Sequence, residues 1–248
     1  MKNRFLIYSF ILLITVSGLV ACSHEARSVP VSSGTSTSDS PASDTPISPS
    51  PTDSISPDPS EKSPMDEYRA VLQNENRFYS VGTDENLYIS EINKVVSDDS
   101  SVKARISKFA IADLEGDDVP EVVLWITVNE DTDFGFEILS YKDGIVYGYT
   151  LWYRAFMELK EDGTFSFSGG TADNGFGRIQ LTDKGYTIDQ ITYCESSVDS
   201  ENNTVISYYV NGESATVEEF NAAIDEQDLK PDVTWYDFTD ENISKVIG

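Results

Sequence analysis

The sequence is short of the side chains that nucleophilic enzymes and zinc proteins use most. It has one histidine, His24, and two cysteines, Cys22 and Cys194, among 248 residues. Because no histidine follows His24, the rest of the chain has no Ser-His-Asp triad, no Cys-His pair and no histidine-ligated zinc. Two cysteines allow at most one intrachain disulfide. We expect Cys194 to be buried in a strand.

Basic residues are also scarce. The chain has 17 Lys and Arg against 43 Asp and Glu, which gives a formal net charge of −26 and a pI of about 4.1. Nucleic-acid binding needs a basic surface, so that class is excluded, and charge-driven docking onto anionic lipid is disfavoured for the same reason. An acidic surface favours solubility and attracts cations.

Only one long hydrophobic run is present, and it lies at the N-terminus. Lys2 and Arg4 precede an apolar stretch from Phe5 to Val20, the order of a signal peptide. The stretch is shorter than the roughly 20 apolar residues of a bilayer-spanning helix. It leads directly into Leu19-Val20-Ala21-Cys22.

This segment resembles the bacterial lipobox, in which the signal is cleaved before a cysteine that receives a diacylglycerol. The resemblance implies that residues 1–22 are a lipoprotein signal peptide and that Cys22 carries acyl chains. Cys194 would then have no partner for an intrachain disulfide. The protein would then be extracytoplasmic and lipid-anchored to the outer face of the cell membrane. An ordinary signal peptide, or a membrane helix with an incidental cysteine, is the alternative.

Large apolar residues are almost missing from residues 23–64, which are rich in Ser, Pro, Thr and Asp. Such a segment buries too little apolar surface to offset the entropy of ordering, and its prolines favour an extended chain. We expect a disordered linker there and one globular domain at residues 65–248.

Helical signals are few in the predicted domain. Apolar spacing predicts a helix over residues 65–80 and a weaker one over 87–96. Thr216-Val217-Glu218-Glu219 has the form of a capping box and predicts a helix that ends before Pro231. Residues 240–246 predict a last short helical turn.

Strand signals dominate between these helices. Residues 121–128 are apolar on both faces, which predicts a strand buried on both sides. Asp143-Gly144, Asp162-Gly163 and Asn211-Gly212 predict hairpin turns. The predicted strands are residues 105–112, 121–128, 136–141, 145–152, 156–160, 164–168, 177–181, 186–193 and 204–210. The sum is an α+β fold: an antiparallel β-meander (a sheet, or a partial barrel or propeller-like form) with N-terminal helices and one C-terminal helix.

One acidic stretch carries a chemical signal. In Asp113-Leu114-Glu115-Gly116-Asp117-Asp118-Val119-Pro120-Glu121, oxygen side chains fall at positions one, three, five and nine. A tight loop with this spacing can turn alternate residues toward one centre, and calcium takes six to eight oxygen ligands. An acidic turn that only connects two strands is the alternative.

The stretch resembles the D-x-D-G-D-x-x-P-E loops of FG-GAP and EF-hand-like proteins, and a similar segment of Gram-positive lipoproteins of mostly unknown function. The resemblance implies that Asp113, Glu115, Asp117 and Glu121 bind calcium, with Val119 contributing its carbonyl. Glu115 stands where the pattern prefers Asp, and Asp118 where it prefers Gly. We therefore expect weak affinity, on the order of 10⁻⁴–10⁻³ M.

Weaker candidates complete the list. Residues 169–177 are glycine-rich and predict a loop, in which Asp173 and Asn174 are candidate ligand contacts. An aromatic platform for sugar rings is conceivable, although core positions are the more common fate of such residues. Its candidates are Trp152, Tyr153, Tyr208, Tyr209, Trp235 and Tyr236.

No catalytic set stands out in these patterns. The sequence therefore predicts a non-enzymatic binding or structural module, calcium-stabilised, with a cell-wall, glycan or protein partner. A carboxylate-based extracellular glycoside hydrolase is the first alternative, because paired acids can cleave glycosidic bonds. A transporter-associated solute receptor is the second, although such receptors usually have two α/β lobes.

Overall fold

The computed structural model describes residues 63–97, 99, 101–129 and 132–248, all within one compact unit, Ile55–Gly248. The predicted signal peptide, Cys22 and residues 23–62 of the predicted linker lie outside the described residues. Within the described part, no helix is long and apolar enough to cross a membrane.

The strands fall into two sheets. The first sheet contains β1 (Phe78–Ser80), β2 (Glu85–Leu87), β3 (Ala104–Ala112), β4 (Glu121–Val128), β5 (Thr132–Lys142), β6 (Ile145–Trp152) and β12 (Tyr236–Asp237). The second contains β7 (Phe165–Gly170), β8 (Asp173–Thr182), β9 (Gly185–Val198), β10 (Thr204–Val210) and β11 (Glu213–Ala215). The helices are α1 (Pro64–Leu72), α2 (Asn93–Val96), α3 (Val217–Asp228) and α4 (Asp240–Val246), with 3-10 turns η1 (Ile89–Glu91) and η2 (Tyr153–Ala155).

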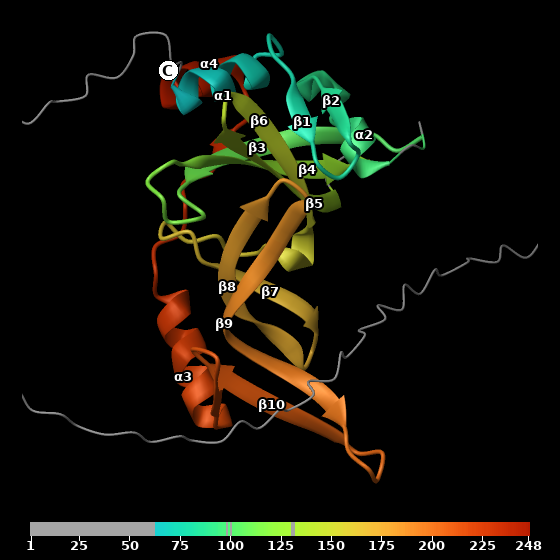
Figure 1. Ribbon diagram of the computed structural model, residues 1–248, viewed down its shortest axis with the longest axis vertical. Coiled ribbons are helices and arrows are strands. Elements are labelled where there is room, and N and C mark those ends of the chain that lie inside the picture. Colours follow the sequence, from blue (N-terminus) through green and yellow to red (C-terminus); the bar gives the residue numbers. More distant parts are fainter. Residues whose placement is uncertain (1–62, 98, 100, 130–131) are drawn as a thin grey trace, which may run out of the picture. The chain divides into compact units, whose positions relative to one another are not determined.

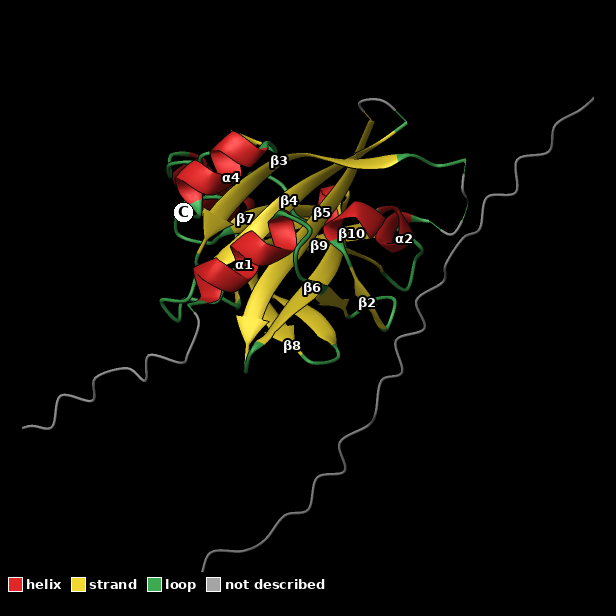
Figure 2. Ribbon diagram, turned by 90° about the horizontal axis from the view of Figure 1, so that it is seen from above, coloured by secondary structure: helices red, strands yellow, loops and turns green. Residues whose placement is uncertain are grey.

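The strand order is β12-β3-β4-β5-β6-β1-β2 in the first sheet and β11-β10-β9-β8-β7 in the second. All described pairings are antiparallel except the short parallel pair of β1 with β6. Figure 1 shows α3 lying along the second sheet, and Figure 2 shows α1 and α4 over the strands of the first. The predicted α+β fold with an antiparallel meander is confirmed.

Strand β4 lies at the centre of the core. Its adjacent residues Val123 and Leu124, which point to opposite faces, are both fully buried, as expected for a strand covered on both faces. The Leu124 face packs with α1 and α4 in one apolar cluster. The Val123 face packs with residues of the second sheet, among them Phe165 and Ile179, in another. The two sheets therefore share a core, in which each fully buried large side chain contributes about 1.5–3 kcal/mol.

Two predicted hairpins and one predicted helix start are confirmed. Asp143 and Gly144 have φ of 51° and 83°, and Asn211 and Gly212 have 52° and 77°, as two-residue turns with both centres at positive φ require. Thr216 accepts a hydrogen bond from the Glu219 amide while the Glu219 carboxylate accepts one from the Thr216 amide. This capping box begins α3 at Val217.

The helix predicted over residues 65–80 is wrong beyond Leu72. Asn74 adopts φ of 62°, a left-handed conformation that commonly ends helices. Phe78–Ser80 then forms β1, which pairs with β2 and β6. The spacing of Phe78 and Tyr79 fits a helix, but pairing with β2 and β6 makes this segment a strand.

Two further segments differ from prediction. Residues 87–96 are not one helix: Leu87 ends β2, and η1 and α2 follow as separate short turns. Residues 156–160 do not form a strand but only isolated bridges, Met157 with Ser166 and Lys160 with Asp232. Glu158 has φ of 50°, which interrupts the extended backbone.

The glycine-rich segment 169–177 is not a loop. It is the tight connection between β7 and β8 together with the beginning of β8. A Cβ at Gly175 would overlap the Thr192 carbonyl oxygen, and one at Gly177 would overlap that of Asp189, both on β9. The glycines therefore allow β8 to approach β9 closely. In the sequence alone, glycines with this role look the same as glycines of a loop.

Candidate functional site

The acidic stretch forms the turn between β3 and β4. The Asp113 carboxylate accepts hydrogen bonds from the amides of Gly116, Asp117 and Asp118, at 2.7, 3.2 and 3.1 Å. Gly116 and Asp118 have φ of 76° and 66°. Asp113 thus satisfies the amides of the turn and holds its two left-handed residues in place.

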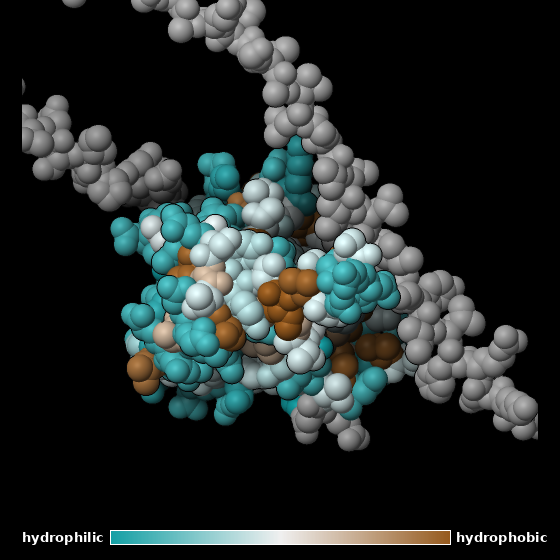
Figure 3. All heavy atoms as spheres, turned by 90° about the horizontal axis from the view of Figure 1, so that it is seen from below, coloured by the Kyte–Doolittle hydropathy of each residue, from teal (hydrophilic) through white to brown (hydrophobic). Residues whose placement is uncertain are grey.

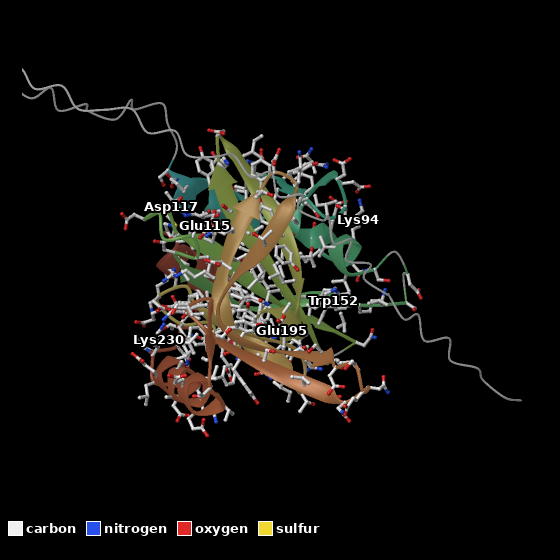
Figure 4. The ribbon with its side chains drawn as sticks, turned by 60° about the horizontal axis from the view of Figure 1, so that its bottom comes forward. Lys94, Glu115, Asp117, Trp152, Glu195 and Lys230 are labelled. Carbon is white, nitrogen blue, oxygen red and sulfur yellow. The ribbon has the colours of Figure 1, made fainter. Side chains whose placement is uncertain are left out.

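The other predicted calcium ligands bond to different parts of the chain. Glu115 accepts from the Leu181 amide at 2.8 Å, and Asp117 accepts from the Val119 amide at 2.9 Å. Figure 4 shows Glu115 and Asp117 in this loop. Among the described residues, no three Asp, Glu, His or Cys side chains are grouped as a metal would need. Calcium binding stays a prediction.

Glu121 closes the turn from inside the core. It is 2% exposed, and its carboxyl accepts from the Leu114 amide at 2.9 Å and from the Ser140 hydroxyl at 3.3 Å. Burial raises the pKa of Glu121 to about 8, an effect that the Leu114 hydrogen bond opposes and that the charges of Glu115 and Asp117 increase. Its bonds to backbone and core make it a structural element of the turn in this conformation.

An aromatic pocket is the feature most suited to a ligand. It is a cavity of about 220 Å³, lined by Trp125, Phe136, Tyr153, Phe156, Met157, Glu158, Leu159, Asp232 and Trp235. The Trp125 and Trp235 rings meet at 74° with centroids 5.1 Å apart, and Trp125 meets Tyr153 at 45° and 5.9 Å. Phe136 is stacked on Tyr153 at 17° and 6.0 Å. The rings therefore pack against one another at different angles, and they line the cavity without forming one flat surface.

Sheet register positions these rings. Trp125 on β4 is opposite Phe136 on β5. Tyr153 begins η2 directly after β6 ends, and Trp235 immediately precedes β12, whose Asp237 pairs with Lys108 on β3. Four separate elements thus bring one aromatic residue each to the same place.

The polar side of the pocket is acidic. Asp232 forms an ion pair with Lys160, with Oδ1 and Nζ 2.6 Å apart; the Lys160 side chain is 7% exposed and that of Asp232 72%. The backbone also ties the two segments, because the Val233 amide donates to the Leu159 carbonyl. For the Glu158 carboxylate, no hydrogen bond or ion pair with another described residue is found. The pocket thus combines aromatic faces with one unpaired negative charge.

A second cavity, of about 370 Å³, lies between α3 and the second sheet, and Arg178 lines it. Four other lining residues form a network: Lys230 Nζ lies 2.8 Å from Asp162, Gln227 Nε2 donates to the Thr164 hydroxyl at 2.8 Å, and that hydroxyl donates to Asp162 at 2.5 Å. Burial alone would raise the pKa of Asp162, but Lys230 and Thr164 lower it to about 2. This network fastens the C-terminal end of α3 to the sheet.

The aromatic residues noted in the sequence separate in space. Tyr153 and Trp235 line the aromatic pocket, whereas Trp152 is 67% exposed and packs on Phe134 at 4.8 Å. The remaining three pair elsewhere, as Tyr193–Tyr209, Tyr208–Phe220 and Phe109–Tyr236. Sequence reasoning missed Trp125, because a residue in a strand apolar on both faces is expected in the core.

The other candidate contacts are engaged within the chain. Asp173 accepts from the amide and hydroxyl of Ser196, at 2.8 Å and 3.0–3.1 Å, and Asn174 donates to the Thr171 carbonyl at 3.0 Å. The Asp173 bonds tie the beginning of β8 to β9, and the Asn174 bond closes the turn that precedes it. Cys194 is buried within β9, as expected. A ligand role for Asp173 and Asn174 stays a prediction.

The chain matches no protein-family model, no curated protein and no solved structure. The resemblances to the lipobox and to calcium loops therefore remain those of the short motifs themselves.

Proposed function

We propose that this chain is a lipid-anchored extracytoplasmic lipoprotein whose folded domain is a non-enzymatic binding module, with its ligand in the aromatic pocket. The anchor follows from the lipobox-like segment at Cys22. The pocket supports the binding role because concave sites with aromatic walls and a few polar groups are typical of ligand sites. The partner is a group exposed outside the cell, such as a component of the cell wall.

The chemistry around the pocket supports binding more than catalysis. A carboxyl that donates a proton near neutral pH needs a raised pKa. The two buried carboxyls with pKa raised to about 8, Glu121 and Glu137, line neither of the two cavities described above. The two acids that do line the aromatic pocket are Asp232, which is paired with Lys160, and Glu158.

The exposed Trp152 provides a matched control for a binding test. Soluble cell-wall fragments should change the tryptophan fluorescence of the full-length protein. Trp235→Leu should abolish the saturable change, whereas Trp152→Leu should keep it, because Trp152 does not line the pocket. Equal responses from the two variants would place the ligand elsewhere.

A glycoside hydrolase is the second candidate, favoured by the two carboxylates beside aromatic rings. A hydrolase should release reducing ends from extracellular polysaccharide, and Glu158→Gln should abolish this release. A non-enzymatic binding module should release none, either as the natural protein or as the Glu158→Gln variant. A solute receptor for a transporter ranks third, because the described residues form two sheets around a shared core and not two α/β lobes.

A further inference from the structure

We propose that the group bound in the aromatic pocket is a cation, an alkylated ammonium such as a trimethylammonium group. This inference rests on the proposed binding function and specifies its ligand. It is carried by the shape of the ring enclosure, by its size and by the charge at its edge.

Shape separates a cation from a flat sugar ring. The Trp125 and Trp235 rings are close to perpendicular, and Tyr153 meets Trp125 at an intermediate angle. A sugar ring stacks on one open aromatic face. Rings that line one cavity at different angles suit a compact, rounded group better than a flat one, and quaternary ammonium groups are recognised by clustered aromatic side chains.

Size points in the same direction. At about 220 Å³ the cavity is smaller than the roughly 300–1,000 Å³ of pockets that take drug-sized ligands. An oligosaccharide would extend far beyond it. A single ammonium head group, with its remaining chain in solvent, matches this volume better.

Charge supplies the attraction. Glu158 lines the pocket with a carboxylate for which no partner among the described residues is found. Asp232 adds a second carboxylate, shared with Lys160. The chain as a whole carries a formal charge of −26, so its field attracts cations and repels anions.

One cation already lies over a ring of this enclosure. Lys108 Nζ lies 5.7 Å from the centre of the Trp125 ring. This contact shows that the ring is placed to accept a positive charge. It also means that Lys108 opposes a cationic ligand, so removing its charge should tighten binding.

The experiment uses the full-length protein in a polyoxyethylene detergent, whose head group carries neither sugar nor ammonium. Tetramethylammonium and choline are titrated by calorimetry, with sodium chloride matching the ionic strength. The neutral isostere 3,3-dimethylbutan-1-ol is the ligand control. We expect choline to bind about 3- to 30-fold more tightly than the isostere.

A phosphocholine arm identifies the source of the group. Binding tighter than that of choline assigns the ligand to a phosphodiester-linked head group, and equal or weaker binding assigns it to a free ammonium compound. Saturable binding of either supports the proposal.

Three variants test the role of charge and rings. Trp235→Leu should remove choline binding. Glu158→Gln should weaken it about two- to threefold, and Lys108→Met should tighten it by a similar factor. Glu213→Gln on β11 and Lys142→Met at the far end of β5 make the same charge changes away from the pocket and should leave the affinity unchanged.

Two results would overturn the inference. If the neutral isostere binds as tightly as choline, the pocket is merely apolar. If methyl glycosides bind at Trp235 and no ammonium compound does, the binding module stands and its cationic ligand is refuted. Failure of the Trp235→Leu test with cell-wall fragments would instead refute the proposed function itself.

Discussion

At Lys160 the fold places an ammonium group where little water reaches it. Its Nζ has Asp232 at 2.6 Å and the Asp228 carbonyl at 3.4 Å. Asp232→Ala should lower the free energy of unfolding by about 2 kcal/mol, because a buried charge loses its charge-assisted hydrogen bond. Urea unfolding with an unchanged m-value would measure this loss.

The double variant Lys160→Met with Asp232→Ala provides the control. Removing both charges relieves the unpaired ammonium, so its stability should return close to that of the natural protein. If Asp232→Ala alone stays within about 0.5 kcal/mol of the natural protein, the pair has no such role.

Glu137 on β5 gives the domain a specific dependence on pH. It is fully buried, its Oε2 accepts from the Thr150 hydroxyl at 2.7 Å, and its Oε1 has no partner in the described part of the chain. Burial raises its pKa to about 8, although the Thr150 hydrogen bond opposes the shift. The folded state therefore holds a proton that the unfolded chain releases above about pH 4.5.

The stabilisation from this proton is complete below about pH 4.5 and is lost as pH rises through about 8. Glu137→Gln should flatten the fall in stability across that window by up to about 1.4 kcal/mol per pH unit. Chemical denaturation at pH 5, 6, 7 and 8 measures the slope, with the exposed Glu213→Gln as reference. Parallel curves for the two variants would refute the assignment.

At the scale of elements, the β3–β4 turn remains a predicted calcium site. If it binds calcium with a dissociation constant of about 1 mM, 10 mM calcium adds about 1.4 kcal/mol. This corresponds to a rise of about 3–6 °C in Tm for a domain of this size. Each of the Glu115 and Asp117 carboxylates accepts its amide hydrogen bond through one oxygen, so the second oxygen of each is the one that calcium would bind.

Adjacent aspartates make a matched pair for this test. Asp117→Asn should remove the calcium-dependent rise in Tm, because Asp117 is a predicted ligand. Asp118→Asn makes the same charge change at a position outside the predicted ligand set, and asparagine tolerates the φ of 66° found there. This variant should therefore keep the calcium-dependent rise in Tm. A Tm that is unaffected by millimolar calcium would remove the metal from this loop.

Elements with local signals were predictable, and elements defined by distant partners were not. The Asp143-Gly144 and Asn211-Gly212 turns and the Thr216 capping box are complete within four residues of sequence. Strand β1 depends instead on β6, nearly seventy residues away, so its apolar spacing was read as helix. Gly175 and Gly177 were misread for the same reason, since their purpose is contact with β9.

At the scale of the whole molecule, the predicted lipid anchor at Cys22 would decide where the domain acts. We expect Cys22→Ala to abolish incorporation of a clickable fatty acid into the protein in a bacterial host, since this thiol is the predicted site of lipidation. Cys194→Ala should retain the label, because Cys194 is buried in β9. Labelling of both variants alike would exclude Cys22 as the acylated residue.

The outer surface is mixed in hydropathy on the face that Figure 3 shows. Figure 3 shows, on the face seen from below, separate apolar patches among polar residues. Isolated patches of this kind do not require a covering partner. The aromatic pocket is therefore a more specific indication of binding than general surface hydropathy.

The sequence by itself determined the features that need only neighbouring residues: the acidic charge, the absence of histidine chemistry in the domain, the tight turns, the capped helix and the strand apolar on both faces. The tertiary structure alone decided the sites. Carboxylates in the β3–β4 turn satisfy amides as distant as that of Leu181. The rings of Trp125, Tyr153 and Trp235 meet only after the strands of the first sheet have paired and the returning C-terminal segment has packed. Convergence of side chains depends on pairing across long loops, and no local pattern encodes it.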